Sequence, residues 1–184
     1  MPRLSSHEME EFLRERGHLA RIATISADGA PSVVPVWFVH ETGKILITPR
    51  SRSAFYANVR RDPRVAVTID EAANVYRKVI VEGRAEILFE PGRDDEWRDI
   101  YRRIARRYVD DDAAEFYIQE TIDQPRALIG IDLRTAKVTT WRMPKGDEPY
   151  TGIWASRYYE PGTKMSRQAS GAAKGATGEK VRIR

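Results

Sequence analysis

The chain has 184 residues, of which 41% are hydrophobic, and this content is enough for one substantial core. The absence of cysteine excludes disulfides, thiolate metal ligands and cysteine nucleophiles. The formal net charge is only +4, because 31 basic residues nearly balance 27 acidic ones, so the composition does not demand a nucleic-acid partner. No apolar run reaches about eighteen residues and no secretory signal pattern is present, so we expect a cytoplasmic protein without a membrane span.

The chain opens with a pattern typical of a helix start. Ser5 and Glu8 have the spacing of a capping box, and apolar residues then recur at helical spacing up to Gly17. A second, short helix is expected after Ser51 or Ser53, either of which can cap it, and Pro63 ends it.

Runs of β-branched and aromatic residues predict strands along most of the chain. Asp28 and Gly29 form a strong hairpin signal between the first two strands. Pro35 cannot donate to a ladder, so we expect a sheet edge, a bulge or an opening there, and Gly83 suggests that a long strand bends at a barrel corner. The expected strands lie at 19–25, 32–39, 44–48, 64–70 and 76–89, followed by a final hairpin at 126–141.

An insert at about 91–124 carries two further predicted helices. The acidic runs at 94–96 and 110–112 lie at the helix starts, where carboxylates complement the dipole, and we interpret them as caps. The arginines of 102–107 occupy the polar face of an amphipathic helix, which we interpret as a solvated face. We expect the insert, with Trp97 and its tyrosines, to determine substrate specificity or to enlarge a dimer interface.

Six or seven antiparallel strands with short turns predict a mainly β fold, a closed or half-closed barrel with peripheral helices. We expect one domain over residues 1–160. A tail over 161–184 is rich in Gly, Ala, Ser and Lys, and we expect it to be mobile unless a partner chain holds it.

Four polar residues gather where the third strand ends and a helix begins, namely Arg50, Ser51, Arg52 and Ser53. Backbone N–H groups, hydroxyls and guanidinium forks at such a place suit a phosphate or a carboxylate. The alternative is that both arginines are solvated loop charges and that Ser53 is only a helix cap. The residues alone leave both interpretations open.

The order of these segments resembles the pyridoxamine 5'-phosphate oxidase-like split β-barrel superfamily of flavin- and deazaflavin-dependent oxidoreductases. The resemblance covers roughly residues 8–89 and resumes at the final hairpin. Its most specific pieces are Arg21 to Thr24, Pro35-Val36-Trp37-Phe38, Thr48, Asn58, Arg60-Arg61-Asp62-Pro63 and Val81-Glu82-Gly83. The resemblance implies a homodimer that binds its cofactor in a groove between the subunits.

The same resemblance implies a set of cofactor-binding residues. The end of the third strand and the following loop hold the cofactor phosphate in this family, which assigns that role to Thr48, Arg50, Ser51, Arg52 and Ser53. The ring system would lie against Pro35, Val36 and Trp37, and the set is completed by Asn58 and Arg77. Candidates for the wall facing the substrate are Trp37, Tyr56 and Tyr76 with Arg77, each with core or dimer packing as the alternative; Arg77 and Lys78 are also candidates to face the partner subunit.

The implied activity is hydride transfer to or from a small organic substrate, with FMN or deazaflavin F-420 as the cofactor ahead of FAD or haem. We nominate no catalytic residue, because the cofactor ring performs this chemistry. Many relatives carry a lysine three residues before the asparagine, where this chain has Phe55. The missing lysine favours F-420 or a non-catalytic role over FMN binding. The strict oxidase activity is not expected, because the C-terminal segment has no Arg-x-His pair.

Two further functions remain open. One is a flavin or haem carrier of the same fold without catalysis. The other is a nucleic-acid binder that uses residues 102–107 and the basic tail. This function needs a contiguous basic stripe, and we place it below the redox functions. A metal site is not expected, because His7, His18 and His40 lie on three different elements without ligand spacing.

Overall fold

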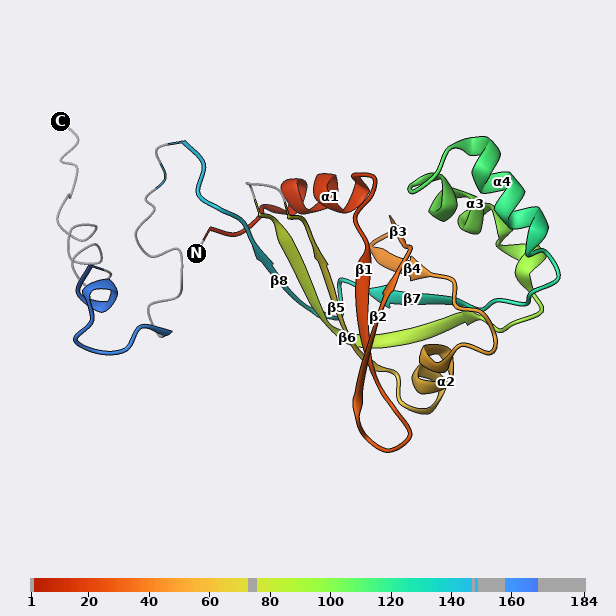
Figure 1. Cartoon of the computed structure of the whole chain (residues 1–184), viewed down its shortest axis with the longest axis horizontal. Coiled ribbons are helices and arrows are strands. Elements are labelled where there is room, and N and C mark those ends of the chain that lie inside the picture. Colours follow the sequence, from red (N-terminus) through yellow and green to blue (C-terminus); the bar gives the residue numbers. More distant parts are fainter. Residues whose placement is uncertain (1, 73–75, 147, 149–157, 169–184) are drawn as a thin grey trace.

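The computed structural model describes residues 2–72, 76–146, 148 and 158–168, and Figure 1 shows their arrangement. The strands are β1 (Ala20–Ile25), β2 (Pro31–Val36), β3 (Val39–Glu41), β4 (Lys44–Ile47), β5 (Arg64–Asp70), β6 (Lys78–Phe89), β7 (Leu128–Asp132) and β8 (Lys137–Trp141). The helices are α1 (Ser6–Arg14), α2 (Ala54–Arg61), the 3-10 helix η1 (Asp94–Glu96), α3 (Arg98–Arg106) and α4 (Asp111–Glu120). The described part of the chain is therefore mainly β, as predicted.

The start of the chain follows its sequence signals closely. Ser5 Oγ accepts a hydrogen bond from the Glu8 N–H at 3.2 Å, and the Glu8 carboxylate accepts one from the Ser5 N–H at 2.8 Å, so the capping box of α1 is confirmed. β1 and β2 pair as the predicted antiparallel hairpin. Pro35 lies on β2, which is the first strand in the sheet order, and its edge position is confirmed.

All eight strands join one antiparallel sheet that curls into a split barrel. The order is β2-β1-β5-β6-β7-β4-β3, with β8 paired to β6 off this path. The sequence run that we predicted as one strand at 32–39 is divided between β2 and β3, which accounts for the eighth strand.

The predicted final hairpin is wrong. β7 and β8 do not pair with each other, because the long β6 offers each of them a separate ladder. Residues 78–82 of β6 pair with β8, whereas residues 85–89 pair with β7. The change of partner falls at Gly83, where a side chain would put its Cβ 2.9 Å from the Cβ of Ala136. A glycine is needed there because the chain entering β8 passes directly over it.

Two hydrophobic clusters hold the molecule together. The larger one fills the barrel with side chains from α1, α2 and most strands, including Phe12, Ile22, Phe38, Ile69 and Val81. The second lies between the helical insert and the strands β3, β4 and β7, and it includes Leu46, Trp97, Ile104, Ile118 and Leu128. Figure 1 shows α3 and α4 side by side at one end of the sheet, where this second cluster fixes them.

The segment that follows β8 is described only in part. Residues 149–157, and residues 169–184 of the predicted tail, lie outside the described residues. Among the helices that the structure describes, none has the length and apolar character needed to cross a membrane.

Candidate functional site

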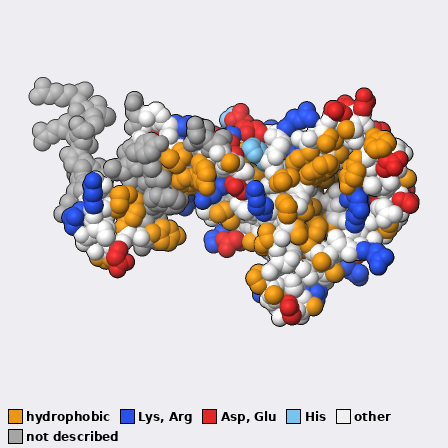
Figure 2. Space-filling view, in the orientation of Figure 1, with side chains coloured by type: hydrophobic (Ala, Val, Ile, Leu, Met, Phe, Trp, Pro, Cys, Tyr) orange, Lys and Arg blue, Asp and Glu red, His pale blue; other side chains and the backbone are white. Residues whose placement is uncertain are grey.

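A cavity of about 270 Å³ opens between the end of β4, the start of α2 and the helical insert. Its lining consists of Val36, Trp37, Ile47, Thr48, Pro49, Arg50, Ser53, Phe55, Tyr101, Ile104, Tyr117 and Arg126. Figure 2 shows hydrophobic side chains gathered over the region between the insert and the barrel, with basic side chains beside them. Apolar and aromatic walls with a few polar groups are typical of small-molecule sites.

The structure brings half of the sequence-predicted cofactor residues to this cavity. Those that line it are Val36, Trp37, Thr48, Arg50 and Ser53, whereas Pro35, Ser51, Arg52, Asn58 and Arg77 lie outside the lining. Residues 35 and 36 separate because neighbouring side chains of a strand point to opposite faces.

Backbone hydrogen bonds hold the loop after β4 in place. The Ser51 N–H donates to the Pro125 carbonyl at 2.9 Å, and the Ala127 N–H donates to the Pro49 carbonyl at 3.0 Å. Ser53 occupies the N-cap position of α2, but its hydroxyl donates to the Arg50 carbonyl at 2.9 Å and makes no capping bond. The hydroxyl therefore fixes the loop rather than capping the first turn of α2.

Asn58 positions α2 from inside the structure. Its side chain is buried, and Nδ2 donates to Thr24 Oγ1 on β1 at 3.1 Å while Oδ1 accepts from Arg61 at 3.2 Å. Because these bonds join α2 to the sheet, Asn58 acts on the cavity through the helix whose start forms part of the wall.

The helical insert supplies the opposite wall. Tyr101 on α3 and Tyr117 on α4 both line the cavity of their own chain. Trp37 stacks on Tyr108 with ring centroids 4.9 Å apart and meets Tyr117 edge-on at 5.8 Å. Burial raises the pKa of Tyr101 to about 12, so this phenol is neutral at physiological pH. Trp97 lies in the second hydrophobic cluster and outside the lining.

Arg126 is a site residue that the sequence analysis missed. It lies just before β7, is only 7% exposed, and donates to the Thr48 carbonyl at 3.0 Å and to the Tyr117 hydroxyl at 3.1 Å. Its guanidinium lies 4.4 Å from the ring centroid of Tyr101. No local motif marks this arginine, and the only usable signal was that the chain returns from the insert to the sheet at this point.

The two tyrosines predicted for the substrate wall lie elsewhere. Tyr56 is buried at 3% exposure, its hydroxyl donates to Glu90, and burial together with this carboxylate raises its pKa to about 12. Tyr76 is half exposed and meets the ring of Trp141 edge-on at 5.6 Å. Neither side chain is part of the cavity lining.

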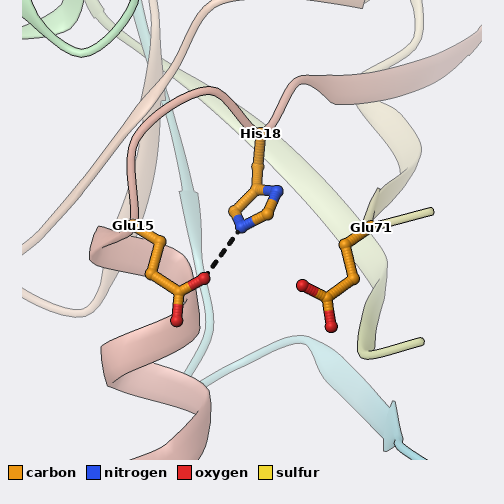
Figure 3. A group of neighbouring side chains, drawn as sticks. All are labelled: Glu15, His18 and Glu71. Carbon is orange, nitrogen blue, oxygen red and sulfur yellow. Dashed lines mark hydrogen bonds and ion pairs between the residues drawn. The ribbon is translucent and has the colours of Figure 1, made fainter. Parts of the chain in front are cut away.

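Arg77 lies in a separate cluster with two glutamates and a histidine. Figure 3 shows Glu15, His18 and Glu71 turned toward one another, and their ligand atoms lie within 4.8 Å. The spacing of the histidines did not reveal this grouping, because Glu71, which directly follows β5, is distant from His18 in the sequence. Arg77 donates to both oxygens of Glu15 at 2.7 Å, and to Glu71 at 2.7 and 2.8 Å.

These bonds make the cluster an ion-pair network around a guanidinium. Hydrogen bonds from Arg77 hold the pKa of Glu15 and the pKa of Glu71 below their usual value of 4.5. All four carboxylate oxygens accept from Arg77, so its guanidinium already balances the two carboxylates of this cluster.

The arginine-rich helix is only partly a solvated face. Arg102 and Arg106 pair with acidic residues of α4, and Arg103 pairs with Glu41 on β3. Arg107 is buried and donates to the carbonyls that end α1, so its predicted solvation is wrong. The physical reason is that a helix C-terminus attracts a cation.

The acidic runs of the insert also divide into two cases. Asp110 caps α4 as predicted, because its carboxylate accepts from the Ala113 N–H at 2.8 Å. Asp94 does not cap α3; its oxygens accept from the N–H groups of Gly92 at 3.1 Å and Arg126 at 2.7 Å. This carboxylate therefore ties the start of the insert to its end.

The fold is a split β-barrel, with a cavity lined by apolar, aromatic and basic side chains at the end of β4. The family model for pyridoxamine 5'-phosphate oxidase matches residues 5–141, and the chain therefore belongs to that family, as its sequence indicates. A search of curated proteins found no match.

Solved structures show the same fold. A conserved hypothetical protein from Mycobacterium tuberculosis is 24% identical, with a TM-score of 0.61 over 79% of this chain and 92% of that chain. An F420 reductase is also 24% identical, with a TM-score of 0.51 over 70% of this chain and 94% of its own. A haem storage protein from Vibrio cholerae is 16% identical, with a TM-score of 0.55 over 73% and 94%.

Proposed function

We propose that this protein is an oxidoreductase that binds FMN or deazaflavin F-420 and transfers hydride to or from a small organic substrate. The observation that carries the proposal is the cavity, whose lining includes Trp37, Thr48 and Arg50, three residues that the family resemblance assigns to the cofactor. An F420 reductase shares the fold, which supports a flavin-type cofactor.

The residues of the cavity fit one end of such a cofactor. Its volume of about 270 Å³ lies just below the range of roughly 300–1,000 Å³ for sites that hold a whole ligand. Arg50 and Ser53 would bind the phosphate end, and Trp37 would orient the ring system at the open side. When bound, the cofactor supplies the ring that accepts or gives up hydride, and the aromatic walls of the insert exclude water from it.

The rest of the cofactor would lie in a groove shared with a second copy of the chain. β2 is an edge strand on which no residue is fully buried, and Val33 is 61% exposed. An open edge with an exposed apolar side chain is a natural pairing surface. A homodimer through this edge would extend the cavity and complete the site.

A parallel titration tests the proposed function. Purified protein is titrated with FMN, F-420, FAD and haem, and binding is followed by cofactor fluorescence or by the haem absorption band. We expect micromolar or tighter binding of FMN or F-420, followed by oxidation of the reduced cofactor when a substrate is added. Tight binding without turnover of any acceptor would favour a carrier, and selective haem binding would favour a role like that of the haem storage protein. Binding of none would contradict the proposal.

A further inference from the structure

Arg126 is a buried cation without a carboxylate partner. It is 7% exposed, its Nε has no hydrogen-bond partner, and no ion pair joins its guanidinium to an acidic side chain among the residues that the structure describes. The nearby Asp94 accepts from its backbone N–H instead. A buried charge left in this state is costly unless something neutralises it.

The other two buried arginines of the described chain also have an Nε without a hydrogen-bond partner, but each faces negative charge or a negative helix end. Arg142 forms ion pairs with Glu148 and Glu8. Arg107 donates to two carbonyl oxygens at the C-terminal end of α1, where the helix dipole is negative. Arg126 instead donates to one carbonyl and one phenol hydroxyl, and its guanidinium lies over the rings of Tyr101 and Tyr117, so no carboxylate balances its charge.

A second arginine lies directly opposite Arg126. Arg50 and Arg126 form an isolated antiparallel bridge, so their side chains leave the backbone on the same side, and both line the cavity. Like charges at directly opposed positions destabilise a pairing. Arg50 is exposed and forms no ion pair with a carboxylate within the described residues, so one buried and one exposed guanidinium line the same cavity.

We propose that Arg50 and Arg126 together bind one oxyanion, a phosphate or a carboxylate, at this end of the cavity. The Tyr117 hydroxyl is the third group of the site, because it lines the same cavity and its oxygen accepts from Arg126 at 3.1 Å. The inference rests on the proposed function, in which the cofactor carries this anion, and it makes the end of the helical insert part of the anion site.

The test compares inorganic phosphate, FMN and riboflavin, which is FMN without its phosphate. In the wild type, phosphate should raise the melting temperature in a concentration-dependent manner, and FMN should bind at least tenfold tighter than riboflavin. Arg126→Met should abolish the phosphate response and weaken FMN binding at least tenfold without changing riboflavin binding. Arg126→Lys keeps the charge without the fork and should lie between the two.

Two variants control this experiment. Arg106→Met removes one positive charge from the insert outside the cavity lining, and it should leave all three ligands unaffected. Tyr117→Phe keeps the aromatic wall and removes only the hydroxyl, so it should weaken the phosphate response severalfold even if Arg126→Met does not fold. A phosphate response that survives in every variant of Arg126 and Tyr117 would overturn the proposal.

The ligands also separate this inference from the proposed function. A phosphate response that depends on Arg126 in a protein that binds no flavin supports the oxyanion site and contradicts the proposed cofactor. A response that depends on Arg126, with FMN and riboflavin binding equally, assigns the anion to the substrate rather than to the cofactor. FMN binding in a wild type that shows no phosphate response contradicts the oxyanion site and leaves the proposed function in place.

Discussion

At the residue scale, Arg50 and Arg52 form a matched pair of variants. The sequence assigned both to the cofactor phosphate, but the structure places only Arg50 in the lining of the cavity. Arg50→Ala should therefore weaken FMN or F-420 binding at least tenfold, since a charge-assisted contact contributes about 1.5–3 kcal/mol. Arg52→Ala should cause a clearly smaller change in the same fluorescence titration. Equal losses in the two variants would favour non-specific attraction by the loop charges.

Gly83 tests how closely the chain passes over β6. Gly83→Ala places a Cβ 2.9 Å from the Cβ of Ala136, so we expect a loss of about 1–3 kcal/mol in the free energy of unfolding. Urea unfolding measures this loss. The double variant Gly83→Ala with Ala136→Gly removes the opposing methyl group and should recover most of the stability. Failure to recover would show that the strand needs glycine for a reason other than this contact.

Single residues were predictable where the signal is local. The Ser5–Glu8 capping box and the Asp110 cap depend on neighbours within one turn, and both formed as expected. Ser53 was less predictable, because its hydroxyl had a competing acceptor in the Arg50 carbonyl. Arg126 carries no local motif, because its position beside the cavity arises only when the chain returns from the insert next to the loop after β4.

At the element scale, Arg77 connects the end of α1 with the β5–β6 connection. Arg77→Met should lower the free energy of unfolding at neutral pH by about 1–3 kcal/mol, because it leaves two carboxylates without their donor. Arg134→Met removes a solvent-exposed pair with Asp132 and should cause a clearly smaller loss in the same measurement.

The same variant should change the response to acid. Arg77 lowers the pKa of Glu15 and the pKa of Glu71, so as pH falls the unfolded chain takes up protons before the folded one. The stabilisation is therefore complete above the usual value of 4.5 and is lost as pH falls through the lowered pKa values. Urea unfolding between neutral pH and about pH 3 should show a shallower acid loss in Arg77→Met than in the wild type. An identical slope would mean that the network does not control these pKa values.

The elements themselves were mostly readable from the sequence, whereas their partners were not. Alternating apolar residues marked β5 and β6, and helical spacing marked α3 and α4. The adjacent strands β7 and β8 looked like a hairpin, but each pairs with its own half of β6. The alternation of apolar residues predicts which face of a strand is buried. It does not predict with which of two neighbouring strands that strand pairs.

At the scale of the whole molecule, the helical insert forms the wall of the cavity that faces the loop after β4. The second hydrophobic cluster anchors α3 and α4 on β3, β4 and β7, so that the tyrosines of the insert face the loop after β4. The sequence left open whether these tyrosines cover the site of their own chain or of a partner. The described chain supplies both walls of this cavity itself, and in the proposed dimer a second copy would extend the site beyond it.

The proposed shared groove would make oligomeric state and cofactor binding depend on each other. Val33→Lys places a charge on the open edge of β2, where its side chain is exposed and opposes Ala23, so folding should change little. We expect light scattering to show a dimer in the wild type and a monomer or a weakened dimer in this variant, with weaker cofactor binding in parallel. Phe116→Lys, on the exposed face of α4, tests an interface through the insert instead. A monomeric Val33→Lys protein that binds cofactor as tightly as the wild type would show that one chain forms the complete site, because the second copy would then contribute nothing to it.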